Sequence, residues 1–224
     1  MTGAALGALV LLSSSAAPSP SGLPAGWEPL LFKKVPTPTA YAWDPAENAV
    51  RAESTAGASG LTYKLGGSPA RRPLLRWRWK VAAPLAAHPE RERGGDDFAA
   101  RVYVTFRYDP TRADALTRAK YALAKKIHGA YPPHGGLAYV WSSTEAVHAT
   151  WPNPYTDRVQ MVAVRTGAGE VGRWLSEERD VLEDYRAVFG EEPPELEGVA
   201  LMTDTDQTGA AAKAWYADVS LSPR

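Results

Sequence analysis

The sequence contains no cysteine and no excess of charge of either sign. Without cysteine, a disulfide, a thiolate metal site, an iron–sulfur cluster and a cysteine nucleophile are all excluded, so stability has to come from the core. The 25 basic side chains are matched by 25 acidic ones, whereas a protein that binds a phosphate backbone needs a surplus of lysine and arginine on one face. Nucleic acid is therefore not expected as a partner.

Motifs of several enzyme classes are missing as well. The sequence has no G-x-S-x-G nucleophile elbow and no P-loop. Its four histidines lack a two-ligand spacing such as H-x-x-x-H, which argues against a zinc site. Residues 167–172 fit G-x-G-x-x-G, but no parallel βαβ pattern surrounds them, so they are interpreted as a glycine-rich hairpin turn.

The N-terminus has the pattern of an export signal. Residues 6–12 form a short apolar run, and small residues and then a Pro/Ser/Gly segment follow, although no basic residue precedes Lys33. A membrane span needs about 20 apolar residues, so no permanent membrane anchor is expected. The sequence predicts a signal peptide and linker over residues 1–21, one β-sandwich domain over 22–224, and a secreted or periplasmic protein. The alternative is a polar tail on a cytoplasmic protein.

Alternation of apolar and polar residues recurs in short segments bounded by glycine and proline, as in half-buried strands. It is clearest in residues 74–81, where Trp77 and Trp79 face one way and Arg76 and Arg78 the other. Further strands are predicted at 29–34, 49–54, 60–65, 97–108, 136–141, 159–166, 198–203 and 213–221, and helices at 111–128 and 182–189. This order predicts a mainly β fold, an antiparallel, jelly-roll-like β-sandwich with one or two short inserted helices.

The polar faces of two predicted strands form one candidate binding surface. They carry Arg76, Arg78 and Lys80 on one strand and Arg101, Tyr103 and Arg107 on the other. Such a set favours an anionic sugar, because arginine makes strong charge-assisted hydrogen bonds to carboxylates and phosphates. On this hypothesis the substitution Arg101→Ala abolishes binding without unfolding the protein.

The proline-rich loop at residues 151–155 forms a second candidate surface. Near it lie Trp141, Asn153 and Tyr155, aromatic rings that could stack on a sugar and an amide that could bond its hydroxyl groups. The alternative is that these aromatic side chains fill the end of the sandwich.

Residues 204–209 imitate the first half of a calcium loop, because Asp204 and Asp206 alternate with other residues before a glycine. The second half is missing, since Trp215 stands where the bidentate glutamate would be. Asp218, or Asp96 and Asp97, could complete a calcium site from neighbouring strands. The alternative is an aspartate-rich loop whose carboxylates accept backbone N–H bonds.

Residues 96–104, 137–141, 153–155 and 202–206 resemble the bacterial domain-of-unknown-function family 3047. The resemblance extends from about Trp27 to Leu221 and implies export, whereas the family has no established activity and supplies no catalytic residue to carry over. The segment 59–61, the tryptophan-rich strand and the final strand 216–221 are also similar to jelly-roll carbohydrate-binding modules of the galactose-binding type. In those modules an aspartate of the terminal strand often holds a structural calcium, and Asp218 is in the matching place.

Three hypotheses about function follow. The first is binding of a cell-envelope or extracellular glycan. The second is an enzyme on the same sandwich, either a polysaccharide lyase using Tyr103 as base beside Arg101, or a glycoside hydrolase using Asp97 and Asp206. The third is a structural envelope protein without a small ligand, which would have its aromatic side chains buried.

Overall fold

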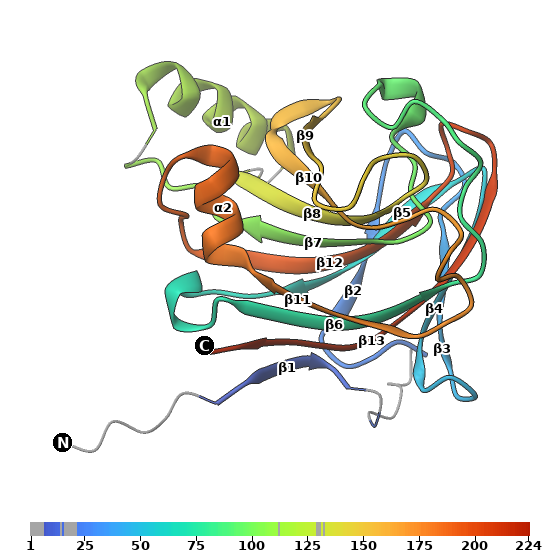
Figure 1. Ribbon diagram of the computed structural model, residues 1–224. Helices are drawn as coiled ribbons and strands as arrows, with labels where there is room; N and C mark the ends of the chain where they lie inside the picture. The colour runs from blue at the N-terminus through green and yellow to red at the C-terminus, as the bar shows by residue number, and fades with distance from the viewer. Residues whose placement is uncertain (1–6, 14, 16–21, 112, 129–130, 132) are drawn as a thin grey trace.

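Strands with one apolar and one polar face build two sheets that pack face to face (Figure 1). The structure, a computed structural model, describes residues 7–13, 15, 22–111, 113–128, 131 and 133–224. Sheet A has the order β11-β6-β13-β4-β3, with β1 also paired to β13. Its strands are β1 (Leu9–Leu12), β3 (Ala40–Asp44), β4 (Ala49–Thr55), β6 (Leu74–Val81), β11 (Leu175–Asp180) and β13 (Ala211–Ser222).

Sheet B has the order β2-β5-β12-β7-β8-β10-β9. Its strands are β2 (Trp27–Leu31), β5 (Ala58–Lys64), β12 (Leu196–Asp204), β7 (Arg101–Phe106), β8 (Gly135–Ser142), β10 (Thr156–Thr166) and β9 (Thr150–Asn153). Single turns of 3₁₀ helix, Pro69–Arg71 and Arg93–Gly95, precede β6 and β7. The predicted mainly β sandwich is therefore confirmed.

The described pairings are antiparallel except that of β8 with β10, which run parallel. Residues 167–172 lie between β10 in sheet B and β11 in sheet A, so this glycine-rich segment is a crossover between the sheets. The predicted hairpin turn is wrong, because the two strands it joins do not pair. Four strands were not predicted, and the first of them, β1, lies in the segment that the sequence analysis assigns to a signal peptide. β3 has weak alternation, β9 contains a proline, and β11 is dominated by charged residues.

Aromatic side chains from both sheets fill the core. Trp77 of β6 packs on Tyr139 of β8 with ring centroids 5.3 Å apart, and Trp79 packs on Trp141 at 5.8 Å. These rings come from the inward positions of β6 and β8, as the alternation predicts. Since aromatic side chains bury large areas, they replace the disulfides that the sequence lacks.

Both predicted helices are present. α2 (Val181–Phe189) begins at Asp180, whose side chain accepts hydrogen bonds from the N–H groups of Leu182 and Glu183, and it ends at Gly190 in the left-handed conformation. α1 (Ala115–His128) lies at the outside of the sandwich (Figure 1). No helix in the described part of the chain is long and apolar enough to cross a membrane.

The N-terminal apolar run contributes an edge strand to sheet A. In β1, Leu9 pairs with Leu221 of β13, and Leu11 and Leu12 are buried. The indole N–H of Trp27 donates to the carbonyl oxygen of Leu11 at 2.8 Å. The predicted cleavage region and linker fall largely on residues 14 and 16–21, outside the described residues, so the signal peptide stays a prediction.

If residues 1–21 form a removable segment, a chain beginning at Gly22 folds without it. β1 is a short edge strand, and losing the burial of Leu11 and Leu12 costs about 3–5 kcal/mol as an upper estimate. We expect one cooperative unfolding transition at a lower Tm than that of the full chain, measured by circular dichroism. Loss of the cooperative transition would show that β1 belongs to the folded domain.

Candidate functional site

A hollow of about 490 Å³ lies on the outward face of sheet B. Its floor lies close to the backbone, because β5 and β12 carry small side chains, among them Gly60 and Ala200, at outward positions. Gly60 pairs in register with Met202, and Ala200 pairs with Tyr103 on the other side of β12. Alternate residues of β12, Val199 and Leu201, point into the core. The same alternation that fills the core therefore leaves space on the outer face.

The walls of the hollow are apolar and aromatic. Leu30, Phe32 and Val35, from β2 and the segment after it, line one side. Tyr103 and Tyr155 line the hollow as well, and Tyr155 is 52% exposed and donates its hydroxyl to the carbonyl oxygen of Arg93 at 2.8 Å. Volume, apolar walls and a few polar groups are the usual properties of a small-ligand site.

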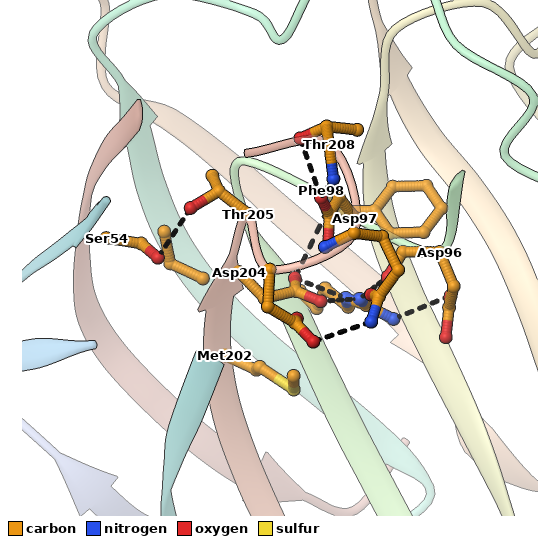
Figure 2. A network of polar contacts seen from close by, with 12 residues as sticks. Ser54, Asp96, Asp97, Phe98, Met202, Asp204, Thr205 and Thr208 are labelled. Atoms are coloured by element: carbon orange, nitrogen blue, oxygen red, sulfur yellow. Dashed lines mark hydrogen bonds and ion pairs between the residues drawn. The ribbon is translucent and has the colours of Figure 1, made fainter. Parts of the chain in front are cut away.

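Arg101 lies at the polar end of the hollow, and Figure 2 shows the network of polar contacts that includes its partners Asp96 and Asp204. Its guanidinium is buried, with the residue 1% exposed, and forms a two-bond ion pair with Asp204, in which the Nε–Oδ1 distance is 2.9 Å. Nη1 donates to Asp96 and to the hydroxyl of Tyr103, both at 3.0 Å, and Nη2 also donates to the backbone carbonyl of Asp96. All five N–H donors are thus used within the protein.

Burial and like charges shift the pKa values at this end. Burial raises the pKa of Asp204 to about 7, with Arg101 acting against it and the carboxylates of Asp97 and Asp96 adding to it. Burial also raises the pKa of Asp206, and Asp97 adds to the effect. A single guanidinium therefore faces several carboxylates, and the polar end of the hollow is acidic.

Asp97, Asp204 and Asp206 place ligand atoms within 4.8 Å of one another, which partly matches the calcium prediction. Asp97 is fully buried and accepts from the backbone N–H groups of Gln207 and Thr208 and from the Thr208 hydroxyl. Asp204 is bound to Arg101, whose positive charge opposes a second cation. The three carboxylates are therefore better explained as part of an ion-pair and hydrogen-bond network within the protein than as a calcium site, because calcium needs six to eight oxygen ligands.

Several predicted residues lie elsewhere. Arg76, Arg78 and Lys80 are on the outer face of sheet A, where they pair with Glu178, Asp218 and Glu47. The basic surface proposed across two strands therefore does not exist, because β6 and β7 belong to different sheets. Arg107, at the end of β7, pairs with Glu195. Asp218 lies with Arg78 and is not part of the group formed by Asp97, Asp204 and Asp206.

The loop residues divide between the hollow and the core. Tyr155 lines the hollow, and the Asn153 amide donates to Asp96 at 2.9 Å, so Asn153 supports the site through Asp96. Trp141 is buried between the sheets and donates its N–H to the carbonyl oxygen of Gly167, which leaves it unable to contact a ligand. For Trp141, the alternative interpretation, in which the aromatic side chain fills the sandwich, is therefore correct.

The sequence analysis did not identify the residues that form the floor of the hollow or those that form one of its walls. The outward Gly198 and Ala200 alternate with inward Val199 and Leu201, a pattern of small outward residues that could have indicated a hollow. Leu30, Phe32 and Val35 have no local signal, because only the pairing of β2 with β5 brings them to the site.

The family described as "Protein of unknown function (DUF3047)" matches residues 25–220. The chain belongs to this family. The resemblance seen in the sequence is thereby confirmed. No curated protein matches the chain.

Among solved structures, this DUF3047 chain is similar to a family 11 carbohydrate-binding module of a cellulosomal cellulase from Clostridium thermocellum. The two share 10% identity and a TM-score of 0.46, with 99% of this chain and 97% of that chain covered. A family 29 carbohydrate-binding module variant complexed with mannohexaose matches at 10% identity and a TM-score of 0.41, covering 96% and 89%. At TM-scores below 0.5 these similarities carry no argument about the ligand.

The structure changes the expected effect of Arg101→Ala. Removing the guanidinium leaves Asp204 and Asp96 buried without their cation, so we expect a loss of about 3–5 kcal/mol of unfolding free energy, measured by urea denaturation. The control is Arg107→Ala, since Arg107 is half-exposed in its pair with Glu195 and its loss costs about 0–1 kcal/mol. Equal stabilities of the two variants would contradict the network.

Asp204 also predicts how stability depends on pH. Its folded-state pKa lies above the ordinary value of 3.8, so the folded protein binds the proton more tightly than the unfolded chain. The resulting stabilisation is present at low pH and is lost as the pH rises through about 7. Because Asp204→Asn cannot titrate, the wild-type Tm should fall more steeply than that of this variant between about pH 5 and pH 8. Parallel Tm profiles would show that Asp204 does not titrate there.

Proposed function

We propose that the hollow on sheet B binds a carbohydrate whose recognised units are uncharged. The observation that carries the proposal is the combination of tyrosine rings, a floor of small side chains and an acidic polar end at which Arg101 uses its donors within the protein. Each part matches a property of a neutral sugar.

The apolar parts of the hollow suit the C–H faces of a pyranose ring. Aromatic rings give sugars a rigid platform, and Tyr103 and Tyr155 both line the hollow. Gly60 and Ala200 provide depth at the centre of the sheet, so a sugar can lie between the tyrosines and the Leu30–Phe32 side.

The polar end suits hydroxyl groups. Asp206 and Gln207 line the hollow, and carboxylate and amide oxygens accept hydrogen bonds from hydroxyl donors. An anionic sugar, the original expectation, is disfavoured because every Arg101 donor is used and Arg76 and Arg78 lie on the other sheet.

The enzyme hypotheses gain no support from the geometry. Asp97 is fully buried and holds the loop at Gln207 and Thr208, so the pair of Asp97 and Asp206 cannot flank a substrate. Burial raises the pKa of Tyr103 to about 12, which makes this tyrosine a poor base near neutral pH. The exposed Tyr155 in the hollow also favours ligand binding over a structural protein with only buried aromatics.

Export of the chain belongs to the same proposal, since an extracellular or periplasmic location would give such a site access to envelope glycans. The apolar run and small residues at the N-terminus support it. The binding experiment below also tests whether the folded chain binds calcium.

The experiment is a thermal-shift panel of neutral and uronic-acid oligosaccharides, each with calcium and with chelator. A ligand that binds only the folded state raises Tm. We expect a rise with a neutral sugar and none with uronic acids, and the same result with chelator. A rise with uronic acids alone would overturn the neutral-sugar proposal, and a Tm that depends on calcium would show that the folded chain binds calcium.

Ala200→Leu is the variant that tests the location. Ala200 points outward from β12 into the hollow, so leucine fills the floor without entering the core, and we expect at least a tenfold loss of affinity. The matched control is Arg76→Ala on the outer face of sheet A, which should leave affinity unchanged. The reverse pattern would place the sugar on sheet A.

A further inference from the structure

α1 is a basic helix that the sandwich hardly covers. Its sequence contains Arg118, Lys120, Lys125 and Lys126 and no acidic residue, and all four basic side chains are exposed. The chain as a whole has equal numbers of basic and acidic side chains, so the positive charge is local to this helix. Asp114 precedes α1 and accepts a hydrogen bond from the backbone N–H of Thr117.

One stripe of α1 is apolar and faces solvent. Leu116 and Leu123 are seven residues apart, which places them on the same helix face, and they are 66% and 59% exposed. The exposed Ala119 lies between them on this face. Lys120 and Lys126 flank the stripe on its two sides, by the 100° rotation per residue of an α-helix.

A different side of the helix attaches it to the sandwich. Tyr121 stacks on Tyr108 with ring centroids 3.9 Å apart, and its hydroxyl donates to the carbonyl oxygen of Pro133 at 3.0 Å. Lys125 lies over the ring of Tyr131 at 4.5 Å. Since Tyr121 and Leu123 are two residues apart, the stripe points away from the contact made by Tyr121. Figure 1 shows α1 at the periphery, beyond β8 and β10.

We propose that α1 docks reversibly on an anionic lipid surface. An interfacial helix has an apolar stripe bordered by lysine and arginine, as α1 does. Its leucines would enter the boundary between headgroups and acyl chains, while the flanking lysines reach the lipid phosphates with their flexible side chains. The lipid surface is favoured because the stripe is narrow and its flanks are purely cationic, which complements a continuous layer of negative charge.

Docking through α1 is independent of the hollow. The helix shares none of the residues that line the hollow, so either proposal can fail while the other holds. Together, the two proposals describe a protein that binds a glycan in the hollow while α1 holds it at a membrane.

The test is co-sedimentation of the full chain with vesicles of phosphatidylcholine alone or with about 30% phosphatidylglycerol. We expect at least tenfold stronger binding to the anionic vesicles, falling as salt increases, because screening weakens exposed charges. Leu116→Ser with Leu123→Ser should abolish binding without changing Tm. Leu31→Ser is the matched control, since Leu31 is an equally exposed leucine (67%) on β2.

Charge-reversal variants show whether vesicle binding depends on the lysines of α1 or only on the net charge of the chain. Lys120→Glu with Lys126→Glu should abolish vesicle binding, whereas Lys33→Glu with Lys34→Glu changes the net charge equally at an exposed segment and should not. Equal loss in both double variants would overturn α1 as the docking element. Absence of vesicle binding by the wild-type chain, or equal binding to neutral vesicles, would overturn the lipid surface itself.

Discussion

The buried ion pair between Arg101 and Asp204 is the interaction on which the arrangement of sheet B depends. It joins β7 to the end of β12, and through Asp96 it holds the segment before β7 as well. The ring of Phe98 lies 4.6 Å from the same guanidinium. Since a buried charge without a partner is costly, the elements that carry these groups must keep their relative positions. Asp97 then fixes the loop at Gln207 and Thr208 beside the pair.

The two outer faces of the sandwich differ in kind. Sheet A carries exposed ion pairs such as Arg76 with Glu178, and its half-buried Trp215 lies 4.4 Å from the ammonium of Lys80. On that face, long charged side chains form ion pairs with one another. Sheet B instead carries glycine and alanine at outward positions beneath the hollow, and the ion pair of Arg101 and Asp204 is buried at one end of it. On the second face the side chains over β5 and β12 are too short to cover the backbone, and the apolar hollow forms there.

Local patterns in the sequence predict the sandwich well and the site only in part. Alternation locates β6 to the residue and identifies Trp77 and Trp79 as core residues, since period-two burial is a local property. Arg101, Tyr103, Tyr155 and Asp206 are found in the hollow, as candidates chosen for their chemistry. The grouping of Arg76 with Arg101 is wrong because assignment of strands to sheets depends on pairings distant in sequence. For the same reason nothing local indicates that Arg101 has all its donors used, or that Leu30 and Phe32 complete the wall.

A crystal structure of the protein with a bound neutral oligosaccharide tests the assignment of the site most directly. We expect the sugar in the hollow on sheet B, in contact with Tyr103 and Tyr155, with its hydroxyl groups near Asp206 and the five donors of Arg101 still bound within the protein. A sugar bound instead on sheet A over Trp215, or one that displaces Asp204 from Arg101, would contradict the site and the role of the ion pair that supports it.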